Sequence, residues 1–230
     1  GRPSAARGAD GGSVRILAGA PATLDPARIG DSGSAAVAAQ LFETLTAFDP
    51  GLVLRPALAS SWTVSDDGLE VRFVLRHGLV FSDGSPLTGE DVVRSWLRVL
   101  DPARPSPLAS LALDIRGARD YLIGADPDPG KVGIRAEGST VIVRLDRPAD
   151  LPSIVSSPTF AIVPKAIEAT GAPRPGDGFV GSGPYRLTSV EAATITLEAN
   201  ERYWAGTPAI GTVTLDRKST RLNSSHVALS

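Results

Sequence analysis

The chain has no cysteine, which excludes disulfide bonds, a thiol nucleophile, a thiolate zinc site and a lipidated cysteine within these residues. Its two histidines, His77 and His226, lie far apart, so neither a metalloprotease motif nor a Ser-His-Asp triad can be assembled. No apolar run approaches the length that spans a bilayer. The 23 basic residues nearly balance the 25 acidic ones, so nucleic acid is not expected as a partner. With 230 residues, 42% of them hydrophobic, the chain is long enough to bury a sizeable core.

Residues 59–102 carry the clearest structural pattern, which begins with a β-hairpin. Trp62 and Val64 precede a turn at Asp67 and Gly68. Beyond the turn, apolar and polar residues alternate with a period of two, the apolar ones being Leu69, Val71, Phe73 and Leu75. This pattern predicts two strands of a half-buried hairpin around an Asp-Gly turn.

The same run continues with a turn and a helix. Ser82, Asp83 and Gly84 have the composition of a turn, and Thr88 can cap the helix that follows. The apolar stripe of this helix consists of Val92, Val93, Trp96, Leu97 and Leu100. Asp101 and Pro102 are expected to end the helix.

The residue pattern of positions 59–102 resembles the signature of the family 5 extracytoplasmic solute-binding proteins, the dipeptide, oligopeptide and nickel receptors of ABC importers. One position departs from the pattern, since Gly89 stands where alanine is usual. The matching residues are Ala59, Trp62, Asp67, Gly68, Phe73, Leu75, Arg76, Phe81, Asp83, Gly84, Pro86, Thr88, Asp91, Val92, Ser95, Asp101 and Pro102.

Two further segments match the same family in the expected order, so the resemblance covers residues 14–216. The first segment contains Leu24, Asp25 and Pro26, followed by Leu41, Phe42 and Glu43. The second contains Gly181, Ser182, Gly183, Pro184 and Tyr185, followed by Asn200, Tyr203, Trp204, Gly206 and Pro208. The stretch between them, with Ser106, Pro107, Pro148 and residues 163–165, looks most like the oligopeptide receptors.

The resemblance implies an α/β fold of the type II periplasmic-binding-protein class, in which two lobes enclose a cleft. Family members are longer than this chain, so we expect a first lobe, with mixed sheets, hairpins and flanking helices, that is truncated before the second. The expected division is a flexible linker at residues 1–13, an incomplete N-terminal lobe at 14–216 and a tail at 217–230. This tail resembles foreign, translated adapter sequence, and the alternative is a native disordered segment.

The resemblance also implies a ligand-binding site, for which residues 27–33 supply a loop rich in glycine and small polar residues. In oligopeptide receptors the corresponding loop pairs with the main chain of the peptide, and by position this role falls on Gly30, Asp31 and Ser32. A second contact, an aromatic residue after Ser-Pro in the family, falls on Leu108, where leucine replaces the aromatic ring. The acidic residue that holds the amino terminus of the peptide belongs to the second lobe.

The function implied by the resemblance is that of a substrate-binding component, which captures peptides outside the cytoplasmic membrane and delivers them to the permease subunits. It would be periplasmic or extracytoplasmic, with a cell-surface lipoprotein as one form, and a monomer when complete. No catalytic residue, metal or cofactor is expected. A receptor for nickel, opine, haem or sugar, and a sensory ligand-binding domain, remain open alternatives. We also expect residues 14–216 to expose apolar surface, to aggregate or to bind ligand weakly.

Three other motifs have simpler structural interpretations. Residues 176–181 satisfy G-x-G-x-x-G, but a strand pattern follows instead of a helix, which favours a loop. The aromatic residues Trp62 and Trp96 are assigned to the core, and Tyr203 with Trp204 to a structural motif. A hydrolase would need acids that the pattern places in turns and in the first turn of a helix, namely Asp66, Asp67, Asp83, Glu90 and Asp91.

Overall fold

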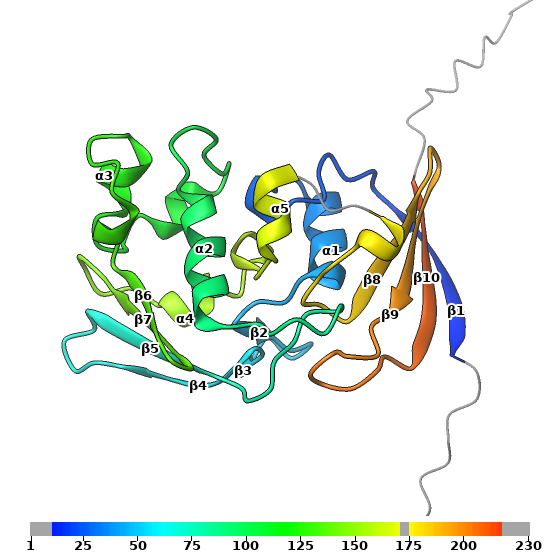
Figure 1. The fold of residues 1–230 in the computed structure, drawn as a ribbon, viewed down its shortest axis with the longest axis horizontal. Coiled ribbons are helices and arrows are strands. Elements are labelled where there is room, and N and C mark those ends of the chain that lie inside the picture. The colour runs from blue at the N-terminus through cyan, green and yellow to red at the C-terminus, as the bar shows by residue number, and fades with distance from the viewer. Residues whose placement is uncertain (1–10, 171–174, 218–230) are drawn as a thin grey trace, which may run out of the picture.

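The computed structural model describes residues 11–170 and 175–217, which form two four-stranded sheets with helices between them (Figure 1). The first sheet has the strand order β1-β10-β9-β8 and contains both ends of the described chain. Strand β1 pairs with β10 in parallel, and the other neighbours are antiparallel. Its strands are β1 (Gly12–Ala18), β10 (Ile210–Arg217), β9 (Thr194–Ala199) and β8 (Tyr185–Val190).

The second sheet lies at the opposite end of the molecule and is antiparallel throughout, with the order β4-β5-β7-β6 (Figure 1). A two-stranded sheet, β2 with β3, lies near it. The strands are β4 (Ala59–Val64), β5 (Glu70–Leu75), β7 (Thr140–Arg144), β6 (Ile134–Glu137), β2 (Thr46–Phe48) and β3 (Leu54–Pro56). The predicted hairpin is therefore confirmed as β4 and β5, with Gly68 in the left-handed conformation that an Asp-Gly turn favours (φ 70°).

The helices are short apart from α1 and α2, which occupy the middle of the molecule (Figure 1). The α-helices are α1 (Ser32–Leu41), α2 (Gly89–Val99), α3 (Ala118–Leu122), α4 (Leu151–Ile154) and α5 (Lys165–Thr170). The 3₁₀ turns are η1 (Pro26–Arg28), η2 (Ala109–Ala112), η3 (Pro129–Lys131), η4 (Pro158–Phe160) and η5 (Gly176–Gly178). Together with the sheets they form the mixed α/β architecture that the sequence predicts.

A hydrophobic core lies between α2 and the second sheet. Trp96 is fully buried, lies edge-on to Phe73 and Phe160, and donates its indole N–H to the carbonyl oxygen of Phe160 at 3.0 Å. Trp62 is half-buried against this core, and His77 is exposed. The core assignments of both tryptophans are thus confirmed. A second core joins α1 to the first sheet through Leu41, Phe42, Phe179, Leu187 and Leu197.

The start of α2 confirms Thr88 as the predicted N-cap, in the form of a capping box. The Thr88 hydroxyl accepts from the backbone N–H of Asp91 and also contacts the Asp91 carboxylate at 2.8 Å. The backbone N–H of Thr88 donates to the same carboxylate oxygen, also at 2.8 Å. Asp91 therefore acts as the acidic half of a capping box, because its short side chain reaches both donors.

The family motif at residues 181–185 packs against the end of α1. A Cβ on Gly183 would lie 2.6 Å from the carbonyl oxygen of Gln40, and one on Gly181 would lie 2.4 Å from that of Leu41. The hydroxyl of Ser182 accepts from the backbone N–H of Glu43 at 2.9 Å and donates to the carbonyl of Ile162 at 2.6 Å. Small residues are therefore required where these two matching segments touch.

The outermost described strands lie close to the predicted limits of the lobe, residues 14–216, which stay a prediction. β1 begins at Gly12 and β10 ends at Arg217. Most of the predicted linker and tail lies outside the described residues. Residues 176–178 form a 3₁₀ turn followed by a loop and strand β8, which confirms a loop in place of a dinucleotide-binding turn.

Candidate functional site

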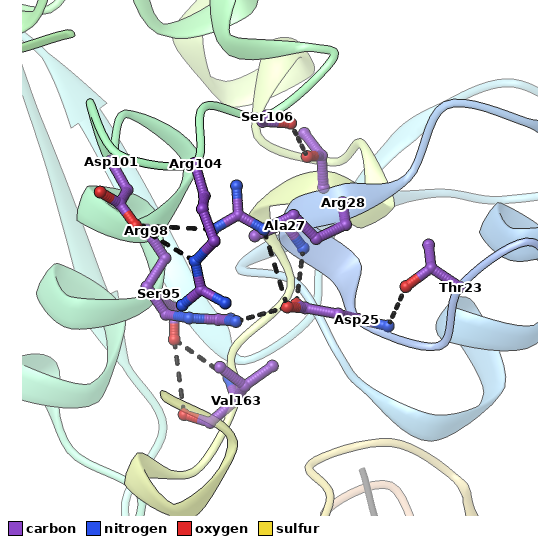
Figure 2. A network of polar contacts seen from close by, with 11 residues as sticks. Thr23, Asp25, Ala27, Arg28, Ser95, Arg98, Asp101, Arg104, Ser106 and Val163 are labelled. Carbon is purple, nitrogen blue, oxygen red and sulfur yellow. Dashed lines mark hydrogen bonds and ion pairs between the residues drawn. The ribbon is translucent and has the colours of Figure 1, made fainter. Parts of the chain in front are cut away.

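The loop before α1 is anchored to α2 by Asp25, whose carboxylate lies at the centre of a polar network (Figure 2). This carboxylate accepts from the backbone N–H of Ala27 at 3.1 Å and from the guanidinium of Arg98 at 2.6 Å. The side chain of Asp25 is only 2% exposed. These hydrogen bonds compensate for the free-energy cost of burying the Asp25 carboxylate. The network therefore holds the start of the loop against α2.

Asp31, one of the predicted ligand contacts, is the N-cap of α1. Its carboxylate accepts from the backbone N–H of Ser34 at 2.8 Å and from the Ser34 hydroxyl at 2.6 Å. These hydrogen bonds hold the pKa of the Asp31 carboxyl below its usual range. Because Asp31 caps it, the helix begins at Ser32, so the last two residues of the predicted loop at 27–33 belong to α1. The side chain of Asp31 thus has a structural task, and its carbonyl accepts from the N–H of Ala35 at 3.1 Å, which leaves only its backbone N–H for a ligand.

Gly30, the second predicted contact, presents unpaired backbone groups at the surface. Residues on both sides are extended, with φ and ψ of −63° and 128° at Ile29 and −141° and 159° at Asp31. Gly30 is exposed, and among the described residues neither its N–H nor its carbonyl has a hydrogen-bond partner. An extended segment with free backbone groups can pair with another strand.

The structure brings the Gly30 segment next to the predicted contact after Ser-Pro. A Cβ on Gly30 would lie 3.5 Å from the ring carbons Cβ and Cγ of Pro107. The following residue, Leu108, is half-buried at the start of η2, and its N–H donates to the hydroxyl of Ser106 at 3.1 Å. Two segments that are far apart in sequence therefore meet at one surface.

Ser32, the third predicted loop contact, lines a different feature. It lines an apolar cavity of about 520 Å³ between α1 and the β1 end of the first sheet, whose lining includes Ile16, Leu17, Val37 and Val213. We call this the β1 cavity. Gly30 and Leu108 do not line the β1 cavity. Of the predicted contact residues, Ser32 alone is part of its lining.

The acids considered for a hydrolase are held in local turns. Asp67 accepts from the Ser65 hydroxyl at 2.6 Å and from the Leu69 N–H at 2.9 Å, and Asp83 accepts from Ser85. Within residues 11–170 and 175–217, no group of three or more His, Asp or Glu side chains is arranged to hold a metal ion. In the same residues, no helix has both the length and the apolar character needed to cross a membrane.

Sequence reasoning missed the partners that hold the site together. Arg98 lies in the last turn of α2, where its charge complements the helix dipole, and its partner Asp25 is 73 positions away. Glu43 accepts a hydrogen bond from the hydroxyl of Tyr203. Burial raises the pKa of Glu43, and burial together with the charge of Glu43 raises that of Tyr203. The local sequence pattern predicts neither the Asp25–Arg98 pair nor the Glu43–Tyr203 pair.

Comparison with known proteins identifies the family of this site. Residues 53–223 match the family described as bacterial extracellular solute-binding proteins, family 5. The chain is 32% identical to the periplasmic oligopeptide-binding protein OppA of Haemophilus influenzae, over 80% of this chain and 35% of that protein. It is 34% identical to the probable deoxycholate-binding periplasmic protein YgiS of Escherichia coli, over 65% of this chain and 28% of that protein.

Solved structures with a similar fold are also periplasmic binding proteins. The structure of the Escherichia coli murein tripeptide binding protein MppA superposes with a TM-score of 0.84 and 29% identity, covering 91% of this chain and 42% of that one. The chain thus spans well under half the length of the proteins it matches. On the match of residues 53–223 and these relatives, the chain belongs to family 5 of the bacterial extracellular solute-binding proteins.

Proposed function

We propose that this chain carries the first lobe of the substrate-binding component of an ABC importer, and that the protein captures oligopeptides outside the cytoplasmic membrane. The captured peptide is delivered to permease subunits, and the protein binds without catalysing a reaction. Names of relatives support this proposal, since OppA is described as oligopeptide-binding and periplasmic, and MppA as murein tripeptide binding.

The observation that carries the proposal is the unpaired backbone of Gly30, which lies between two extended residues and beside Pro107. A peptide that adds a strand here forms main-chain hydrogen bonds, which do not depend on its side chains. Leu108 offers an apolar surface of modest size next to this strand position, where it accepts varied side chains. A binding site of this kind suits a receptor of broad sequence tolerance.

The proposal is tested by adding short peptides to the ¹⁵N-labelled 230-residue chain and following its amide signals by NMR. Millimolar trialanine is expected to shift the amide signals of Gly30, Asp31 and Ser32, and tripeptides of other composition shift the same signals. Affinity is expected to be weak, because the lobes of family members bind the ligand jointly. An analogue with N-methyl groups on its backbone cannot donate these hydrogen bonds and is the matched control.

Three results would contradict the proposal. The first is the absence of any shift at residues 30–32, and the second is an equal shift with the N-methylated peptide. The third is a shift of these signals by deoxycholate and not by peptide, which would assign the surface to an amphipathic steroid.

A further inference from the structure

A cavity of about 290 Å³, separate from the β1 cavity, lies between α2, the loop after it, η1 and α3. Its lining is dominated by guanidinium groups, and we call it the arginine cavity. Two segments that are far apart in sequence supply them, Arg28 from η1 and the others from α2 and the loop after it (Figure 2). The polar lining residues are Arg28, Arg94, Arg98, Arg104, Asp101 and Tyr121.

Two of the four arginines that line the arginine cavity have a close carboxylate partner among the described residues, and the other two lie farther from theirs. Arg94 pairs with Asp91, and Arg98 pairs with Asp25 at 2.6 Å. The remaining arginines, Arg28 and Arg104, share the carboxylate of Asp101. The two nitrogen–oxygen distances to Asp101 are 3.7 Å from Arg28 and 4.0 Å from Arg104, which are too long for hydrogen bonds. Neither Arg28 nor Arg104 is therefore hydrogen-bonded to Asp101.

Arg28 is the group that most lacks a partner. Its side chain is 21% exposed, its Nε lies 4.0 Å from the already paired Asp25, and its Nη1 is buried without a hydrogen-bond partner among the described residues. Burial lowers the pKa of Arg28, and repulsion from Arg98 and Arg104 adds to this effect, while Asp25 and Asp101 partly offset it. A buried, unpaired donor on a cation is costly, and an anion at this position would remove the cost.

We propose that the arginine cavity binds a small oxyanion, through Arg28 and Arg104 with Arg98 beside them. Planar guanidinium groups suit the oxygens of a phosphate, sulfate or carboxylate group, which accept two parallel hydrogen bonds. The volume of about 290 Å³ lies at the lower end of the range for ligand pockets, so it suits an ion or a single acidic group. Leu97 and Tyr121 also line this cavity. The site does not depend on peptide binding at Gly30.

The test titrates the 230-residue chain with inorganic phosphate by calorimetry, at constant ionic strength set with chloride. Arg28→Gln and Arg104→Gln are each expected to weaken phosphate binding roughly tenfold, since each removes charge-assisted hydrogen bonds. The side chain of Arg104 is 62% exposed, so Arg104→Gln tests the site even where Arg28→Gln lowers stability. The matched control is Arg116→Gln, whose side chain is 53% exposed and lies outside the cavity.

The oxyanion has two possible sources, and a second arm of the experiment distinguishes them. The peptides Ala-Glu-Ala and Ala-Gln-Ala differ only in one carboxylate. Phosphate binding that both cavity variants weaken supports a site for a free ion. Preference for Ala-Glu-Ala that Arg28→Gln abolishes supports a site for an acidic group of the ligand. Binding that survives both variants, or the absence of binding in both arms, overturns the proposal.

Discussion

The carboxylate of Asp25 and the guanidinium of Arg98 form a 2.6 Å hydrogen-bonded ion pair that joins the loop before α1 to α2. Their side chains are 2% and 13% exposed. Asp25→Ala leaves the guanidinium without its main partner, so we expect the free energy of unfolding to fall by roughly 3–5 kcal/mol, measured by urea denaturation. The double variant Asp25→Ala/Arg98→Met should be less destabilised than the sum of the single changes.

The matched control for this pair is the ion pair of Arg15 with Asp216, whose side chains are 66% and 32% exposed. Arg15→Ala is expected to change stability little, because solvent screens an exposed pair. If the Asp25 and Arg15 variants lose the same stability, the buried pair does not anchor the loop.

Glu43 gives the chain a pH dependence whose sign follows from its environment. Burial raises the pKa of its carboxyl above the usual 4.5, so the folded chain binds this proton more tightly than the unfolded chain does. The stability from this group is fully present below pH 4.5 and is lost as the pH rises through the raised value.

The substitution Glu43→Gln tests this dependence, because glutamine keeps an acceptor for Tyr203 but carries no charge. Its stability relative to wild type should therefore rise between pH 4 and pH 8 in urea denaturation. A difference that is flat or falls over this range would show that Glu43 titrates without a burial penalty.

Leu52 is strained in the turn between β2 and β3. Its φ is 59°, a left-handed conformation that leucine rarely adopts, and its side chain is 81% exposed. Asparagine tolerates this conformation, so Leu52→Asn should raise the free energy of unfolding by about 1 kcal/mol. Leu52→Val, which adds a β-branch at the same position, should lower it. Loss of stability in the asparagine variant would contradict the assigned strain.

The edge strand β1 exposes apolar side chains that favour self-association. Leu17 is 67% exposed and lines the β1 cavity, and Ile16 is 47% exposed. A charge on an edge strand opposes pairing with another chain, so Leu17→Lys should shift the protein toward monomer in sedimentation velocity. Ile123→Lys is the control, since Ile123 is 68% exposed but lies after α3, away from any strand edge. An equal effect of both substitutions would indicate that solubility, not the edge, is responsible.

Local features of the fold could be predicted from the sequence because the residues that define them are neighbours. The Asp67–Gly68 turn, the alternation along β5 and the stripe of α2 each need only a few consecutive positions. The anchor of the loop could not be predicted, since Asp25 and Arg98 meet only after η1 has packed against α2.

The position of the candidate site rests on resemblance and stays a prediction. Gly30 and Leu108 were assigned by resemblance, and the structure brings their segments together at Pro107. Asp31 before Ser32 has the residue type of an N-cap, and this signal could have assigned its side chain to α1 rather than to a ligand. The arginines around Arg28 come from α2 and the loop after it, and no local sequence pattern shows that these segments meet η1.

The most direct test of peptide capture at the loop compares two substitutions at one residue. Gly30→Pro removes the backbone N–H, and the extended conformation of Ile29 is compatible with a following proline. Gly30→Ala keeps the N–H and places its Cβ at an ordinary distance of 3.5 Å from Pro107. Both variants should keep the wild-type Tm, because the Gly30 N–H has no partner in the protein. Peptide affinity should fall by up to roughly tenfold in Gly30→Pro only. Equal affinity of the proline and alanine variants would contradict the account.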